Sequence, residues 1–211
     1  DAGVDAGPAA PSATIRSISP EIDLAGADDR ALGFVATNDR LVSDTGARTA
    51  TVTREGVEIV LDGAPIALGH AEVNVSGAPV VLGAPEVDAS ARATRRGVGI
   101  DETLESRLGV LEQRWHFAER PSAEITVRVP IPGAILERED TRGLHLVRGA
   151  ARFVYSHARF VDAGGAASDV PATFEDGAVV LRVSATLVQR TRFPAVLDPT
   201  IGPEIPVTDA V

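Results

Sequence analysis

Residues 48–68 read RTATVTREGVEIVLDGAPIAL, and this stretch decides the fold class. β-Branched residues dominate around Val52 and over residues 57–61, and such side chains fit a pleated, half-buried surface. The pairs Glu55-Gly56 and Asp62-Gly63 separate these pieces, and both are typical of hairpin turns. The stretch therefore predicts two successive β-hairpins.

The same alternation of short apolar runs and turn residues extends over most of the chain from Ile15 onward. Ala71, Val73 and Val75 alternate with polar residues, which predicts a strand with one buried face. Further strand-like segments are LEQRWHFAE (111–119), AEITVRVPI (123–131), GLHLVRG (143–149), ARFVYSHARFVD (151–162), VPATFED (170–176) and AVVLRVSATLV (178–188).

One segment departs from this pattern. Residues 88–109 lose the alternation, and the spacing of Asp101, Leu104 and Leu108 predicts one or two helical turns. Prolines after residue 110 argue against long helices there.

We therefore expect an all-β protein, an antiparallel β-sandwich of about 12–15 short strands, with a closed β-barrel as the alternative. The expected organisation is a flexible linker over 1–14, a β-rich half over 15–100, a sandwich or meander over 101–200 and the start of a second linker over 201–211. The two β-rich parts would form two packed halves divided near residues 95–110.

Composition excludes several kinds of chemistry. The chain of 211 residues contains no cysteine, which rules out disulfides and thiolate metal sites. Its net charge of -10 repels nucleic acids and anionic lipids, and the only adjacent basic pair that stands out, Arg95-Arg96, is too small to bind them. No apolar run is long enough to insert a helix into a membrane.

The first residues suggest export. The sequence begins DAGVDAGPAAPS without an initiating methionine, and this low-complexity composition is typical of a tether that follows a signal segment. We expect the protein to be secreted or displayed at the cell surface.

Three elements resemble the N-terminal all-β domain of large exported repeat proteins from GC-rich Gram-negative bacteria. They are Leu111-Glu112-Gln113 before an aromatic strand, the turn Asp162-Ala163-Gly164-Gly165, and Phe193-Pro194 leading into Leu197-Asp198-Pro199. The resemblance covers roughly residues 105–207. It implies export and a β-repeat region downstream, and it brings no catalytic residues with it.

The sharpest catalytic motif is Asp44-Thr45-Gly46, because aspartic proteases place a carboxylate on such a turn. The chain has only one copy, so the second carboxylate would have to come from a homodimer. Asp-Thr-Gly is also ordinary hairpin-turn chemistry, and we favour that interpretation.

The four histidines do not indicate a metal-binding or catalytic site. His70, His116, His145 and His157 lack the spacing that places two metal ligands on one helix face. His116 and His145 each sit between apolar neighbours, which predicts that both point outward from alternating strands. No Gly-x-Ser-x-Gly motif marks a serine nucleophile.

Binding of calcium or glycans stays open as an alternative. The acidic stretches Asp28-Asp29, Glu137–Asp140 and Glu175-Asp176 lack the spaced pattern of an EF-hand. Trp115 and Tyr155 are the only residues of their kinds, which makes a stacked aromatic platform for sugars weak.

The sequence thus predicts no catalytic, cofactor-binding or metal residue. It favours a non-catalytic structural or interaction domain that caps or displays downstream repeats. The expected partners are downstream domains of the same polypeptide or other extracellular proteins.

Overall fold

The computed structural model describes residues 33–46, 48–107 and 109–204, which form 21 strands and one short helix. The expected linker over 1–14, the pair Asp28-Asp29 and residues 205–211 lie outside these ranges. All strand pairs are antiparallel and belong to three sheets, here called A, B and C.

Sheet A is a five-stranded meander and contains both hairpins predicted from residues 48–68. Asp62 and Gly63 have φ angles of 48° and 78°, the left-handed pair that a two-residue hairpin turn requires. The strands are β1 (Val35–Thr37), β2 (Arg40–Asp44), β3 (Arg48–Val52), β4 (Gly56–Leu61) and β5 (Ala64–Gly69).

Sheet B also has five strands and joins early and late parts of the chain. Its order is β18 (Ala172–Glu175), β19 (Ala178–Val183), β12 (Ile125–Pro130), β6 (Glu72–Val75) and β7 (Ala78–Val80). Because β6 pairs with β12, residues from the expected halves 15–100 and 101–200 share this sheet.

Sheet C is the largest, with 11 strands. Its main path runs β13 (Ile135–Asp140), β14 (Gly143–Arg148), β15 (Ala151–Ser156), β21 (Thr200–Pro203), β11 (Val110–Phe117), β10 (Ile100–Arg107), β9 (Ala93–Arg96) and β8 (Glu86–Val87). Beside this path lie β16 (Ala158–Val161), β17 (Ala167–Val170) and β20 (Ala195–Asp198).

The prediction of one or two helical turns from the spacing of Asp101, Leu104 and Leu108 is wrong. Residues 100–107 form β10, which pairs with β11 along its whole length. The alternation is hidden in the sequence because Glu102 and Ser106 occupy buried positions that apolar residues normally fill.

Two further segments differ from expectation. The strand predicted over 178–188 ends at Val183, and Ser184 caps a short helix, α1 (Ala185–Arg190), by accepting a hydrogen bond from the Leu187 N–H. Residues 201–203, expected to begin a linker, belong to β21, where Ile201 is fully buried between β11 and β15.

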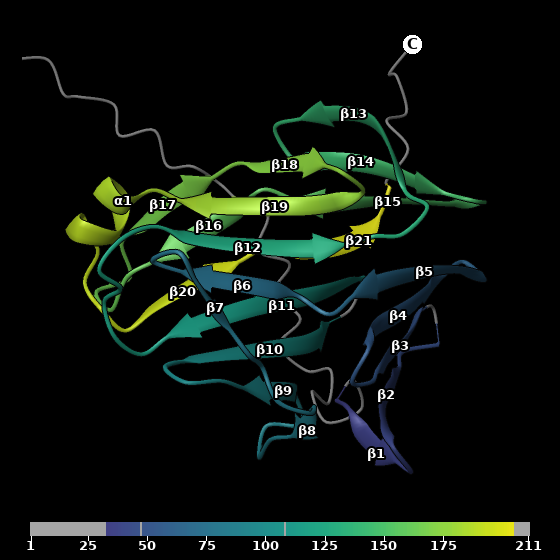
Figure 1. Ribbon diagram of the computed structural model, residues 1–211. Coiled ribbons are helices and arrows are strands. Elements are labelled where there is room, and N and C mark those ends of the chain that lie inside the picture. The colour runs from purple at the N-terminus through teal and green to yellow at the C-terminus, as the bar shows by residue number, and fades with distance from the viewer. Residues whose placement is uncertain (1–32, 47, 108, 205–211) are drawn as a thin grey trace, which may run out of the picture.

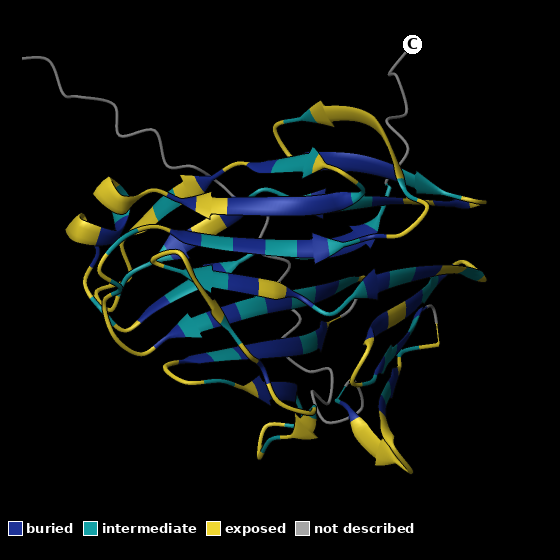
Figure 2. Ribbon diagram, viewed as in Figure 1, coloured by how far each residue is buried: buried dark blue, intermediate teal, exposed yellow. Residues whose placement is uncertain are grey.

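The sheets form an antiparallel β-sandwich, and the described residues form no closed barrel. Sheet B lies over sheet C, and sheet A closes one end of the two layers (Figure 1). One hydrophobic core contains residues of all three sheets, among them Ile59, Val127 and Trp115. Burial is concentrated between the layers, whereas β1 and β13 are exposed (Figure 2).

A buried polar network ties sheet A to sheet C. Arg95 Nη1 lies 2.7 Å from Glu102 Oε2, and neither side chain is more than 2% exposed. Gln113 Nε2 donates to Glu102 Oε1 at 2.6 Å, and the Tyr155 hydroxyl donates to Gln113 Oε1 at 2.9 Å. Arg95 Nη2 donates to the carbonyls of Thr53 and Gly56, so one guanidinium connects β9 to the turn between β3 and β4.

The substitution Glu102→Gln tests this network. It keeps the side chain's shape but leaves the Arg95 charge without a counter-ion in the core, so we expect the free energy of unfolding to fall by about 3–5 kcal/mol. Urea denaturation measures the change. The control is Glu175→Gln, which breaks the exposed pair with Arg182 and should leave the midpoint nearly unchanged. Equal midpoints for the two variants would contradict a stabilising role for the buried pair.

Candidate functional site

The candidate site is a groove at one end of strands β10, β11, β16 and β20 in sheet C, with a volume of about 580 Å³. Most of its lining is apolar or small, including Phe117, Val161 and Ala195. Three polar side chains, Asp101, His116 and Asp162, also line it. The site is therefore an open, largely apolar groove with a few polar groups.

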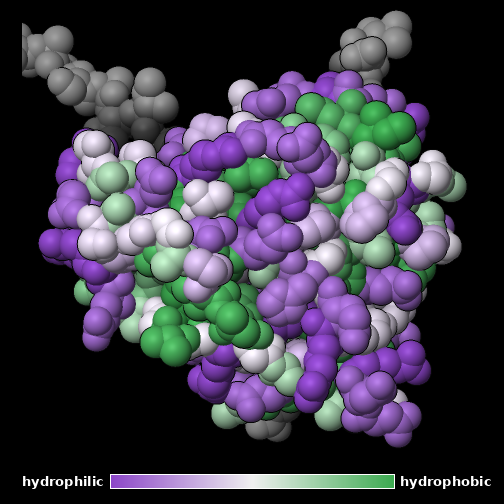
Figure 3. All heavy atoms as spheres, in the orientation of Figure 1, coloured by the Kyte–Doolittle hydropathy of each residue, from purple (hydrophilic) through white to green (hydrophobic). Residues whose placement is uncertain are grey.

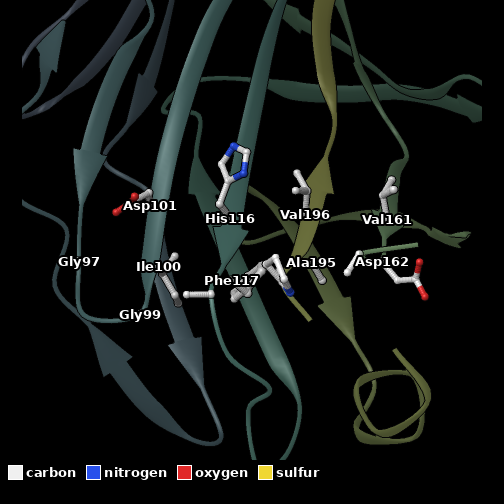
Figure 4. Close-up of a pocket in the computed structure, with 13 residues that line it drawn as sticks. Gly97, Gly99, Ile100, Asp101, His116, Phe117, Val161, Asp162, Ala195 and Val196 are labelled. Carbon is white, nitrogen blue, oxygen red and sulfur yellow. The ribbon is translucent and has the colours of Figure 1, made fainter. Parts of the chain in front are cut away.

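The strand register explains this arrangement. Asp101 pairs with His116, His116 pairs with Val196, and Val196 pairs with Val161, so residues of four strands form one row (Figure 4). Phe117, next in sequence to His116, points to the opposite face and is buried. The row of four residues thus lies on the sheet face opposite the Phe117 ring, and the two meet at the end of the sheet.

His116 is the titratable group best placed to act on a ligand. Its Nε2 lies 3.1 Å from the Thr103 hydroxyl, which orients the ring. Burial lowers the pKa of His116 below its ordinary value, and the nearby positive charges of Arg114 and Arg92 add to the effect. The ring is consequently a neutral imidazole at neutral pH, able to exchange hydrogen bonds with a bound group.

The two carboxylates of the groove already have partners. Asp162 accepts hydrogen bonds from the backbone N–H groups of Gly164 and Ala166 and from Arg192 Nε. These bonds lower the pKa of Asp162, with the bond from Arg192 contributing most. Asp101 lies 3.5 Å from Arg96. The turn Asp162-Ala163-Gly164-Gly165, one of the elements of the resemblance, is therefore stabilised by the Asp162 carboxylate itself.

A charged cluster borders the groove along the same face of sheet C. Arg114 forms ion pairs with Glu105 at 2.9 Å, with Asp198 at 3.1 Å and with Glu112. Burial raises the pKa of Glu112, against the opposing charges of Arg114 and Arg107. Arg114 and Arg107 thus hold three carboxylates together on this face.

The structure places Asp44 on a hairpin turn. It is the exposed last residue of β2, and its Oδ1 accepts a hydrogen bond from the Gly46 N–H at 2.8 Å. The Thr45 N–H donates to the carbonyl of Arg48, which closes the turn. The carboxylate thus stabilises its own turn.

The expectation that His145 points outward is wrong. The side chain is fully buried, because carboxylates from two other segments cover it. Its Nε2 lies 3.0 Å from Asp140 Oδ2, and its Nδ1 lies 2.9 Å from Glu204 Oε1. His116 is half-buried between the buried residues Trp115 and Phe117, so it points away from the core as expected.

The remaining histidines have backbone partners. His157 Nε2 lies 2.9 Å from the carbonyl of Asp140, and its Nδ1 accepts the Ala172 N–H. His70 Nδ1 lies 3.0 Å from the carbonyl of Ala71. The structure does not bring these two rings to the groove.

The acidic stretches at 137–140 and 175–176 face arginines. Hydrogen bonds from the Arg142 backbone N–H, His145 and Arg138 hold the pKa of Asp140 well below its usual range. Hydrogen bonds from Arg182 and Thr173 lower the pKa of Glu175 to about 2. Within the described ranges, no three His, Asp or Glu side chains converge as metal ligands would.

The two unique aromatic residues are unavailable to a sugar. Trp115 and Tyr155 are fully buried, so neither offers a ring face at the surface. Burial also raises the pKa of Tyr155 well above its usual value.

Comparison with known proteins gives no relative: no protein-family model matches the chain, and a search of curated proteins finds no match. Among the described residues, no helix is long and apolar enough to span a membrane.

The pKa of His116 provides a direct test of the site's electrostatics. Because folding lowers this pKa, the unfolded chain binds more protons between the folded and unfolded values, so acidification through that window reduces stability. Arg114→Gln removes a positive charge and should raise the His116 midpoint in an NMR titration. Arg142→Gln, remote from the groove, is the control. A midpoint unaffected by Arg114→Gln would show that this charge does not act on the ring.

Proposed function

We propose that this chain is a non-catalytic structural or interaction domain of an exported bacterial multidomain protein. In this proposal it caps or displays repeats that follow it in the polypeptide. Its partners are those downstream domains or other extracellular proteins.

The observation that carries the proposal is an exposed edge strand with two apolar side chains, which is ion-paired to the last described residue. Strand β13 is an outer strand of sheet C and is exposed along nearly its whole length. Ile135 and Leu136 are 69% and 37% exposed, and a hydrophobic patch lies over β13 in Figure 3. Exposed apolar side chains on a sheet edge are typical of an interaction surface.

The end of the described chain is held at this edge. Glu204, its last residue, pairs with Arg138 of β13 at 2.9 Å. Arg138 follows Leu136 by two residues in β13, so Glu204 is paired to the strand that carries the two exposed apolar side chains. This proximity supports a contact between β13 and a downstream part of the polypeptide.

The partners of the acidic groups support the non-catalytic part of the proposal. Asp162 binds its own loop and Arg192, and Asp44 binds its own turn. Arg114 gathers the carboxylates beside the groove. These groups stabilise the fold, and a dimeric aspartic protease would have to take Asp44 away from this role.

Export is supported by sequence features alone. The low-complexity residues 1–12 and the resemblance over residues 105–207 both favour a secreted or surface-displayed protein. The net charge of -10 is consistent with a solvated extracellular domain.

A ligand-binding module is the second candidate, and the groove beside His116 is the observation that favours it. Small side chains leave the space open, and His116 and Asp101 offer polar groups for hydroxyls. A hydroxyl-rich ligand such as a glycan fits these groups better than calcium does, because calcium requires six to eight converging oxygens.

Amide hydrogen exchange tests the proposed contact. In the parent polypeptide, the amides of β13 should exchange more slowly than in the 211-residue chain, because a downstream domain would cover this edge. Strand β18, the outer strand of sheet B, is the control and should exchange alike in both.

The variant Ile135→Lys should abolish the added protection in the parent polypeptide while leaving the fold intact, since its side chain is largely exposed. Equal exchange of β13 in the two unsubstituted proteins would contradict an interaction at this edge.

A further inference from the structure

A groove separate from the one at His116 lies where three turns of the chain meet, at the side of the molecule where β5, β14 and β15 project (Figure 1). Its volume is about 450 Å³. The walls come from the turn between β4 and β5 with the start of β5, from residues 132–133 between β12 and β13, and from the turn between β14 and β15. Every lining residue other than Arg148 is glycine, alanine or proline. The groove is therefore apolar apart from one cation.

Two backbone carbonyls hold the Arg148 guanidinium in place. Its Nε donates to the Pro132 carbonyl at 2.8 Å, and its Nη1 donates to the Pro65 carbonyl at 3.0 Å. Pro65 belongs to sheet A, whereas Arg148 belongs to sheet C, so the side chain connects the two sheets. A guanidinium that is fixed before binding loses little conformational entropy when a ligand arrives.

The guanidinium keeps unused donors and an unpaired charge. Arginine has five N–H groups, and the two hydrogen bonds engage only two of them. Within the described ranges, Nη2 has no hydrogen-bond partner, and no carboxylate lies within ion-pair distance of Arg148. Arg152 on the next strand differs, because it pairs with Glu137. Arg148 thus presents a cation without a counter-ion to the groove that it lines.

Glycine turns keep this cation accessible. Gly133 and Gly149 have φ angles of 76° and 58°, in the left-handed region that residues with a side chain rarely adopt. A Cβ added at Gly133 would lie 4.0 Å from Arg148 Nε, and one added at Gly149 would meet no atom within 4 Å. The turn conformation therefore favours glycine at both positions and leaves open space beside the guanidinium.

These features select a ligand with one negative charge and an apolar body. A carboxylate matches the single positive charge and can accept two parallel N–H bonds from a guanidinium. A doubly charged phosphate would leave one charge without a partner against apolar walls. The proline and alanine surfaces would cover a short hydrocarbon chain. We propose that this groove binds small monocarboxylates with an aliphatic chain, and that Arg148 recognises their carboxylate.

The test compares two probes, hexanoate and 1-hexanol, which have the same number of carbon atoms and differ in charge. NMR spectroscopy of the 211-residue chain at neutral pH follows the backbone amides of Gly133 and Gly149 and the Nε–H of Arg148. Hexanoate should shift these signals saturably. It should bind at least about tenfold more tightly than 1-hexanol, because only the carboxylate forms charge-assisted hydrogen bonds with Arg148.

The variant Arg148→Met keeps the aliphatic part of the side chain and removes its charge, so hexanoate should then bind no more tightly than 1-hexanol. The matched control is Arg159→Met, because Arg159 is an exposed arginine of β16 that does not line this groove. Its affinity for hexanoate should equal that of the unsubstituted chain.

Equal affinities for the two probes in the unsubstituted chain, or no saturable shift of these signals with hexanoate, would overturn the proposal. Unchanged hexanoate binding in Arg148→Met would overturn it as well. The comparison of the two probes requires no substitution, so the test stands even if Arg148→Met does not fold.

Discussion

The buried pair of Arg95 and Glu102 is the interaction on which the arrangement of the sheets depends. Apolar contacts between sheets A and C have no direction, whereas this pair and its hydrogen bonds fix where the turn between β3 and β4 meets β9. Gln113 and Tyr155 extend the same constraint across β11 to β15. These contacts can form together only in one relative position of the two sheets.

Ion pairs with arginine also position charged groups outside the core. Carboxylates at Glu112, Asp162 and Glu175 each face an arginine, so part of the acidic surface is organised by pairing. Carboxylates that are ion-paired within the fold are consistent with the proposed structural domain. The groove at His116 is a place where polar side chains face open space rather than the core.

Sequence reasoning predicted the fold class and the hairpins of sheet A, because Asp62-Gly63 has turn chemistry that acts locally. It underestimated the number of strands and mistook β10 for helical turns, because Glu102 and Ser106 are polar residues at inward positions. Arg95 and Gln113, on the two strands paired with β10, make Glu102 tolerable there, and alternation within one strand cannot reveal such cross-strand partners. His145 was missed for the same reason, since Glu204 lies far away in sequence.

The claim that Arg95 holds sheet A on sheet C is tested most directly by amide hydrogen exchange in Arg95→Met. The account predicts that amides of β3, β4 and β5 lose protection while those of β12 and β19 in sheet B keep it, because Thr53 and Gly56 lose their link to β9. Unchanged protection in sheet A, or an equal loss in sheets A and B, would contradict it.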